Sequence, residues 1–221
     1  MQKITNTLLS LLTALTLTTA KAENLTAQIE AGHSMGYVIN GVERAGEAAF
    51  AGVGLGVTYN KIDFSLGSTA LLGDAGSDWK FGVGKGFALF DGLTAQVSLD
   101  TYRHQLATSS TETALSLALK NKFITPYIKG SYDFDLNEQG YTVGLTKDFT
   151  IFTVQIAPAV EFAKFESYET FSVKVGGAKD IFKHIQLFSD VGYYDANGAP
   201  SYSTRDIDGK FLTTAGVRWV F

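Results

Sequence analysis

The sequence predicts an all-β fold, a single twelve-stranded antiparallel up-and-down barrel, and three observations lead to this prediction. After residue 24, most of the chain alternates apolar and polar residues with the period of two that is typical of a β-strand. Tight-turn signals and longer polar stretches separate these segments. Glycine is abundant at 23 residues and proline is rare at three, so one barrel or sandwich could use up the 221-residue chain.

Each alternating segment keeps its apolar residues on one face. The expected strands are residues 25–39, 49–59, 62–70, 79–89, 93–100, 114–120, 124–134, 141–145, 152–162, 170–176, 185–193 and 210–221. An even number lets both chain ends lie at the same end of a single-chain barrel. The short turns, such as Asn60-Lys61 and Asp91-Gly92, follow even-numbered strands, and the longer loops follow odd-numbered ones.

The start of the chain predicts export. A lysine at position 3 precedes an apolar run that ends in Ala20-Lys21-Ala22, which is the order of a secretory signal peptide over residues 1–22. The run is too short for a spanning helix, which needs about 20 residues. The mature domain would therefore cover residues 23–221. The absence of cysteine excludes disulfides and thiolate metal sites, and the net charge of −4 argues against a nucleic-acid partner.

The last segment, residues 210–221, places Phe211, Ala215, Val217, Trp219 and Phe221 on one face. Its order of a polar residue, a glycine and two aromatic residues resembles the C-terminal signal of bacterial outer-membrane β-barrels. The resemblance implies that this strand binds the barrel assembly machinery. The residues that carry it are Thr214, Gly216, Trp219 and Phe221.

The apolar face of the barrel could point inward, as in a soluble barrel, or outward into lipid. Twelve inward apolar rows would have to fill a wide interior, whereas eight strands already leave only enough room for side chains. The outward solution is therefore preferred. It predicts a transmembrane barrel in the bacterial outer membrane, because hydrocarbon offers no partner to an open sheet edge.

Two positions conflict with regular strands. Lys85 falls on the apolar row of its segment, so we expect a bulge in Gly84-Lys85-Gly86 or an early end to the strand. Pro158 lies in mid-strand without a backbone donor and predicts a local irregularity. The segment at residues 141–145 is the shortest of the expected strands.

Charged residues lie on the polar face, which would surround the lumen. We expect these side chains to line a pore: Glu30, Asp63, Lys80, Asp100, Lys120, Lys129, Asp133, Glu161, Lys174, Asp190 and Arg218. They could border a water-filled passage, or they could pair into a plug. The passage is preferred because twelve strands lie between the packed eight and the open sixteen, and glycines such as Gly52, Gly54 and Gly56 leave the wall bare. By loop length, only residues 195–209 could fold inward as a constriction.

A hydrolytic site is not apparent. His33 and Ser34 lie on opposite faces of a strand, and His104 is expected in a polar loop with Ser109 and Ser110, where no spacing holds a base against a nucleophile. His184 is likewise expected at an interface or in a loop. The glycines near Gly54 have strand spacing with no helix after them, so they do not form a phosphate-binding loop. The sequence predicts no enzyme, no cofactor and no metal site.

A family resemblance comes from residues 36–44, Gly-Tyr-Val-Ile-Asn-Gly-Val-Glu-Arg, and the glycine-rich strand that follows them to Tyr59. This segment is similar to the N-terminal part of small TorF-type putative porins, although Ile39-Asn40 stand where an aromatic residue and an arginine are more usual. The resemblance covers about a fifth of the chain. It implies a pore-forming barrel and identifies no substrate.

The expected function is passive diffusion of small hydrophilic solutes or ions through an outer-membrane porin-like channel. A closed structural barrel that presents its outer loops, residues 195–209 above all, to partners is the alternative. An outer-membrane hydrolase is a third possibility. The expected partners are outer-membrane lipid, the assembly machinery and the solutes themselves.

Overall fold

The computed structural model describes residues 24–39, 42–72, 76–105, 109–198 and 209–221, so the expected signal peptide lies outside the described residues. The strands of the barrel wall are β1 (Asn24–Ser34), β4 (Ala48–Tyr59), β5 (Ile62–Leu71), β6 (Gly76–Phe90), β7 (Leu93–Gln105), β8 (Ser109–Asn121), β9 (Thr125–Asp133), β10 (Glu138–Thr146), β11 (Phe149–Ile151), β12 (Val154–Phe165), β13 (Glu169–Phe182), β14 (Ile185–Asn197) and β15 (Lys210–Val220). A separate hairpin consists of β2 (Tyr37–Ile39) and β3 (Val42–Ala45). Within these ranges, no helix is long and apolar enough to cross a membrane.

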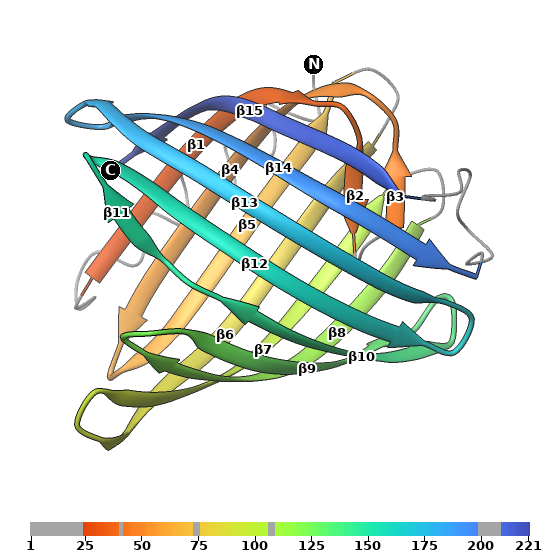
Figure 1. Ribbon diagram of the computed structural model, residues 1–221, viewed down its shortest axis with the longest axis horizontal. Helices are drawn as coiled ribbons and strands as arrows, with labels where there is room; N and C mark the ends of the chain where they lie inside the picture. The colour runs from red at the N-terminus through yellow and green to blue at the C-terminus, as the bar shows by residue number, and fades with distance from the viewer. Residues whose placement is uncertain (1–23, 40–41, 73–75, 106–108, 199–208) are drawn as a thin grey trace.

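The wall is a closed antiparallel barrel (Figure 1). Strands that follow one another along the chain pair in order, β1 pairs with β15, and β10 pairs with β12. The short β11 lies beyond the end of β10 along the same edge of β12, so the two occupy one position in the wall. The wall therefore has twelve strand positions, which confirms the predicted fold. We call the end with the tight turns and the C-terminus the turn end, and the opposite end the loop end.

The apolar rows face outward, as predicted. Large apolar side chains such as Leu115 (58% exposed) and Ile128 (50% exposed) lie on the outer surface of the strands. Buried apolar residues are few and form only small clusters. An outer surface of this kind is stable against hydrocarbon but not against water.

Several strands are longer than predicted. The run at 93–100 continues as β7 to Gln105, and the next strand begins at Ser109, so residues 104, 105 and 109–111 of the expected loop lie in strands. His104 therefore lies in a strand, and its expected place in a loop is wrong. The polar residues that suggested a loop lie at the loop ends of two paired strands, β7 and β8.

The first strand is shorter than predicted because its alternation continues into the hairpin. β1 ends at Ser34, whose hydroxyl donates a 2.8 Å hydrogen bond to the carbonyl oxygen of Gly36. The amide of Met35 donates to the carbonyl oxygen of Thr213 on β15 at 2.9 Å. The chain then continues into β2 and β3, which pair with each other and lie at the loop end of the barrel (Figure 1).

The expectation for Lys85 is wrong. β6 runs through this residue in regular register, and its irregularity lies later, between Ala88 and Phe90. Lys85 pairs with Ile62, the first residue of β5, so it lies level with a turn at the end of the barrel. Its ammonium group lies 5.5 Å from the ring centre of Phe87. A lysine near the end of the barrel destabilises it much less than a lysine at the centre of the apolar belt would.

The irregularity expected at Pro158 is found in the neighbouring strand. β12 pairs with β13 in unbroken register through Pro158. On its other side, Pro158 has no N–H to donate, and the facing strand is interrupted between Thr146 and Phe149. The carbonyl oxygen of Pro158 still accepts the amide of Lys147 at 3.1 Å.

Candidate functional site: the barrel lumen

The lumen contains three adjoining cavities. The wide cavity, about 600 Å³, lies against β1 and β4 to β9. The central cavity, about 530 Å³, lies against β1, β4, β5, β10 and β12 to β15. The turn-end cavity, about 370 Å³, reaches Asp148. Glu30 and Val38 line both the wide and the central cavity, while Asp190 and Arg218 line both the central and the turn-end cavity. The cavities therefore form one series inside the wall.

Val38 brings the β2–β3 hairpin into this series, since it lines the wide and the central cavity together with Glu30 and Thr69. Ala45 of the same hairpin packs against the cluster of Ala48, Phe50, Leu71 and Phe188. Among the described residues, the first loop therefore reaches into the barrel. The prediction that only residues 195–209 could fold inward is wrong, and residues 199–208 lie outside the described residues.

The glycines Gly52, Gly54 and Gly56 of β4 do not leave the wall free of side chains, although this was predicted for them. A Cβ atom on Gly52 would lie 3.1 Å from Cγ of Glu30, and one on Gly54 would lie 3.0 Å from Cγ of Gln28. The side chains of β1 therefore lie against the glycines of β4. The glycine columns provide room for these polar side chains on the wall, as well as for the wide cavity.

Ion pairs cross neighbouring strands of the lumen. Arg218 Nε lies 3.0 Å from Glu30 Oε2, across the seam where β15 meets β1. The guanidinium group also lies 4.7 Å from the ring centre of Phe188. Lys174 pairs with Glu161, which also accepts hydrogen bonds from Tyr127 and from Ser172. These contacts hold charged groups at defined places on the wall.

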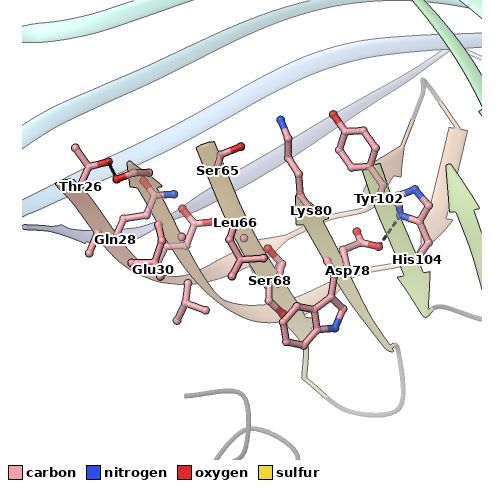
Figure 2. A pocket seen from close by; sticks show the side chains of 18 of the residues that line it. Thr26, Gln28, Glu30, Ser65, Leu66, Ser68, Asp78, Lys80, Tyr102 and His104 are labelled. Carbon is pink, nitrogen blue, oxygen red and sulfur yellow. Dashed lines mark hydrogen bonds and ion pairs between the residues drawn. The ribbon is translucent and has the colours of Figure 1, made fainter. Parts of the chain in front are cut away.

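A second charged group lies on the side of β6 to β9 (Figure 2). Lys80 Nζ lies 3.0 Å from Asp100 Oδ1 and 5.4 Å from the ring centre of Tyr102. In Figure 2, Lys80 and Tyr102 project from adjacent strands to the same side, into the lumen. Nearer the loop end, His104 Nδ1 lies 2.7 Å from Asp78 Oδ1. These side chains make the wide cavity polar and charged on one side.

His104 is nearly enclosed, with 2% of its surface exposed, and it lies between two acidic side chains. Its Nε2 atom lies 3.9 Å from Glu112 Oε2, and Glu112 Oε1 lies 3.9 Å from Lys129 Nζ. The imidazole ring stacks on Tyr102 at 5.9 Å between ring centres. The four strands β6 to β9 thus share one network of alternating charge, which orders this part of the wall.

The same register brings Asp78, His104 and Ser110 into one row, because they are direct cross-strand partners on three neighbouring strands. A nucleophile needs a hydrogen bond to its base and access to substrate. Ser110 is completely enclosed, and among the described residues its hydroxyl has no hydrogen-bond partner. The row is therefore not arranged as a hydrolytic site. No group of three His, Asp or Glu side chains in the described ranges could hold a metal ion.

The predicted pore-lining residues fall into three groups. Those that line the cavities are Glu30, Lys80, Lys129, Lys174, Asp190 and Arg218. Asp100 and Glu161 pair with two of these lysines. The third group does not line the three cavities and consists of Asp63, Lys120 and Asp133. Asp63 accepts a hydrogen bond from Thr58. Asp133 is buried and accepts hydrogen bonds from the backbone amides of Asp135 and Leu136. Contact of any of them with a solute stays a prediction.

Sequence reasoning missed four side chains of the wide cavity, Asp78, Tyr102, His104 and Glu112. They lie at the loop ends of β6, β7 and β8, which extend further toward that end than the predicted strands at 79–89, 93–100 and 114–120. Their sequence positions could have identified them, because residues an even number of positions apart in a strand share a face. Asp78 lies two residues from Lys80, and His104 lies four residues from Asp100.

The four residues of the predicted assembly signal also have structural contacts. Thr214 shares a 2.8 Å hydrogen bond with Ser34 across the β1–β15 seam. A Cβ atom on Gly216 would lie 2.8 Å from Cζ of Phe188, so the glycine leaves room for that ring. The rings of Trp219 and Phe221 stack at 5.5 Å. Binding to the assembly machinery stays a prediction.

Comparison with known proteins identifies the fold. No protein-family model matches the chain, and no curated protein matches it significantly. Among solved structures, the KdgM porin in complex with disordered oligogalacturonate is similar over 88% of this chain and 99% of its own, at 10% identity and a TM-score of 0.63. The NanC porin is similar over 87% of this chain and 98% of its own, at 13% identity and a TM-score of 0.60.

An outer-membrane channel from Pseudomonas putida F1 is also similar, over 89% of this chain and 95% of its own, at 11% identity and a TM-score of 0.54. The likeness extends over nearly the full length of these barrels, whereas the identities are low. The comparisons therefore show that the chain has the fold of outer-membrane porins and channels.

Proposed function

We propose that the protein is a porin-like channel of the bacterial outer membrane, through which small hydrophilic solutes or ions diffuse passively. The observation that carries the proposal is the series of three cavities, each with charged side chains in its lining, inside a closed wall whose outer surface is apolar. Such a lumen needs no chemistry, because its polar groups replace part of a solute's hydration and its charges bias the ions that pass.

The proposal has three further parts: the protein is one of the small TorF-type porins, it is exported through a cleaved signal peptide, and the assembly machinery recognises its last strand. The fold shared with the KdgM and NanC porins supports them. We expect no catalytic activity, since the hydroxyl of Ser110 is enclosed in the row that it forms with Asp78 and His104.

A closed barrel that presents its loops to partners is the second candidate. The inward position of Val38 and the pairing of the lumenal charges favour it, because the hairpin occupies space inside the barrel and paired charges attract solutes less. Current measurement separates the two candidates. Refolded protein in a planar bilayer should give steady current steps if the lumen is open, and none if it is closed.

Cysteine labelling gives this experiment an internal control, because the natural chain has no cysteine. Ser65 lines the wide cavity, whereas its neighbour Phe64 is exposed on the outer face. A bulky charged thiol reagent should reduce the current of Ser65→Cys and leave that of Phe64→Cys unchanged. Equal effects on the two variants would mean that the current does not pass through this lumen.

A further inference from the structure

Every basic side chain that lines the three cavities lies beside a carboxylate. The pairs are Arg218 with Glu30 at 3.0 Å, Lys80 with Asp100 at 3.0 Å, Lys129 with Glu112 at 3.9 Å, Lys174 with Glu161, and His104 with Asp78 at 2.7 Å. A charge next to its opposite has little effect at a distance. The basic side chains of the described lumen therefore offer little attraction to an anion.

Two carboxylates of the cavities differ from this pattern, Asp148 at the turn end and Asp190 in the middle of β14. Among the described residues, Asp190 has no salt bridge and no side-chain hydrogen bond, and it is exposed to the lumen. Its cross-strand partners are Gly176 and Thr214, and neither carries a charge. The nearest bases, Arg218 and Lys174, attract it from a distance, but each already has its own carboxylate.

Its position places this charge on the route of a solute. Asp190 lines both the central and the turn-end cavity, together with Arg218 and Phe188. The acidic groups at this level are Glu30, Glu161 and Asp190, against two bases, Lys174 and Arg218. A solute that moves from one cavity to the next therefore passes a site of net negative charge.

We infer that the lumen selects cations over anions and that Asp190 sets this selectivity. The inference rests on the proposed channel function and specifies its substrate class: small cations and positively charged hydrophilic solutes, with acidic saccharides disfavoured. The KdgM porin, which shares the fold, was solved with an oligogalacturonate, a chain of carboxylate-bearing sugars. The charge arrangement of this lumen favours solutes of the opposite sign.

The test is the ratio of potassium to chloride permeability, measured from the reversal potential across a planar bilayer with a KCl gradient. We expect a ratio above one for the natural chain. A charge about 6 Å from the path of the ion in a water-like medium attracts the cation and repels the anion, and screening at 0.1 M salt reduces both effects. Asp190→Asn should therefore lower the ratio about threefold at 0.1 M salt. Asp190→Lys should bring it below one. The preference should weaken from 0.1 M to 1 M salt, as the screening length falls from about 10 Å to about 3 Å.

Asp63→Asn is the matched control, because it removes the same charge from a lumenal carboxylate outside the three cavities. Its effect on the ratio should be smaller. A preference for chloride in the natural chain would overturn the inference and leave the channel intact. An unchanged ratio in Asp190→Asn, or an equal change in Asp63→Asn, would also overturn it. Absence of current steps in every variant would refute the channel, and the inference with it.

Discussion

Gly140 on β10 faces Phe165 on β12, and this pair allows a stability prediction with a defined partner. A Cβ atom on Gly140 would lie 2.8 Å from Cγ of Phe165 and closer still to two other ring carbons. Carbon atoms at their best separation are about 3.5 to 4.0 Å apart, so the ring would have to move by about 1 Å or more. Phe165 is only 7% exposed and stacks on Tyr168 at 4.5 Å between ring centres.

Gly140→Ala should therefore lower the free energy of unfolding by about 1–3 kcal/mol, the usual cost of overpacking. The three nearest atoms to the added methyl group all belong to Phe165. Phe165→Ala removes these atoms, so in that background Gly140→Ala should cost close to nothing. The difference between the two backgrounds is the coupling energy of the pair.

Urea unfolding of protein refolded in phospholipid vesicles, followed by tryptophan fluorescence, would measure all four members of this cycle. Gly130→Ala on the neighbouring strand β9 is the control, because a Cβ atom there would meet nothing within 4 Å. It should be neutral, or stabilising by about 0.5–1 kcal/mol, since glycine weakens a strand. Equal destabilisation by Gly140→Ala in both backgrounds would show that the ring contact is not the cause.

Three further predictions concern the hairpin, the outer surface and a strained turn. Val38→Trp should lower the single-channel conductance, because the side chain lies where two cavities adjoin; an unchanged conductance would place the hairpin away from the route. Leu117→Lys should destabilise the barrel in vesicles by about 2–4 kcal/mol on urea unfolding, and the inward Ala118→Lys by less; the reverse order would contradict the outward apolar row. Phe152 and Thr153 have φ angles of 47° and 73°, which bulky and β-branched residues adopt only at a cost in free energy. Replacing them with Asn-Gly should therefore raise the free energy of unfolding by about 1–2 kcal/mol, measured as a higher urea midpoint. A lower midpoint would show that the exposed ring of Phe152 stabilises the barrel.

The number of strands and the identity of their faces could be predicted from the sequence because both depend on a local period. Side chains alternate between faces at every residue, so the parity of Leu115 and Ile128 is enough to place them on the apolar face. The choice between inward and outward needed one further argument, the width of a twelve-stranded interior. The structure agrees with it, since both side chains are exposed.

The ends of strands could not be predicted in this way. Polar residues occur both in loops and at the inward positions of a strand that extends past the apolar belt, and residues 104–111 have the same composition in either case. His104 lies in a strand because Asp78 and Ser110 are its cross-strand partners. Those partners come from two other segments of the chain, and a pattern within one segment contains no information about them.

A barrel of twelve strand positions with an apolar outer face follows from the amino-acid sequence, because period and parity are properties of each segment alone. The division of the lumen and the pairing of its charges depend on how distant segments come together in three dimensions. The hairpin turns inward because Met35 bonds to Thr213 at the far end of the chain, and Arg218 is neutralised because closure brings Glu30 beside it. Both contacts join residues that meet only when the first and last strands pair.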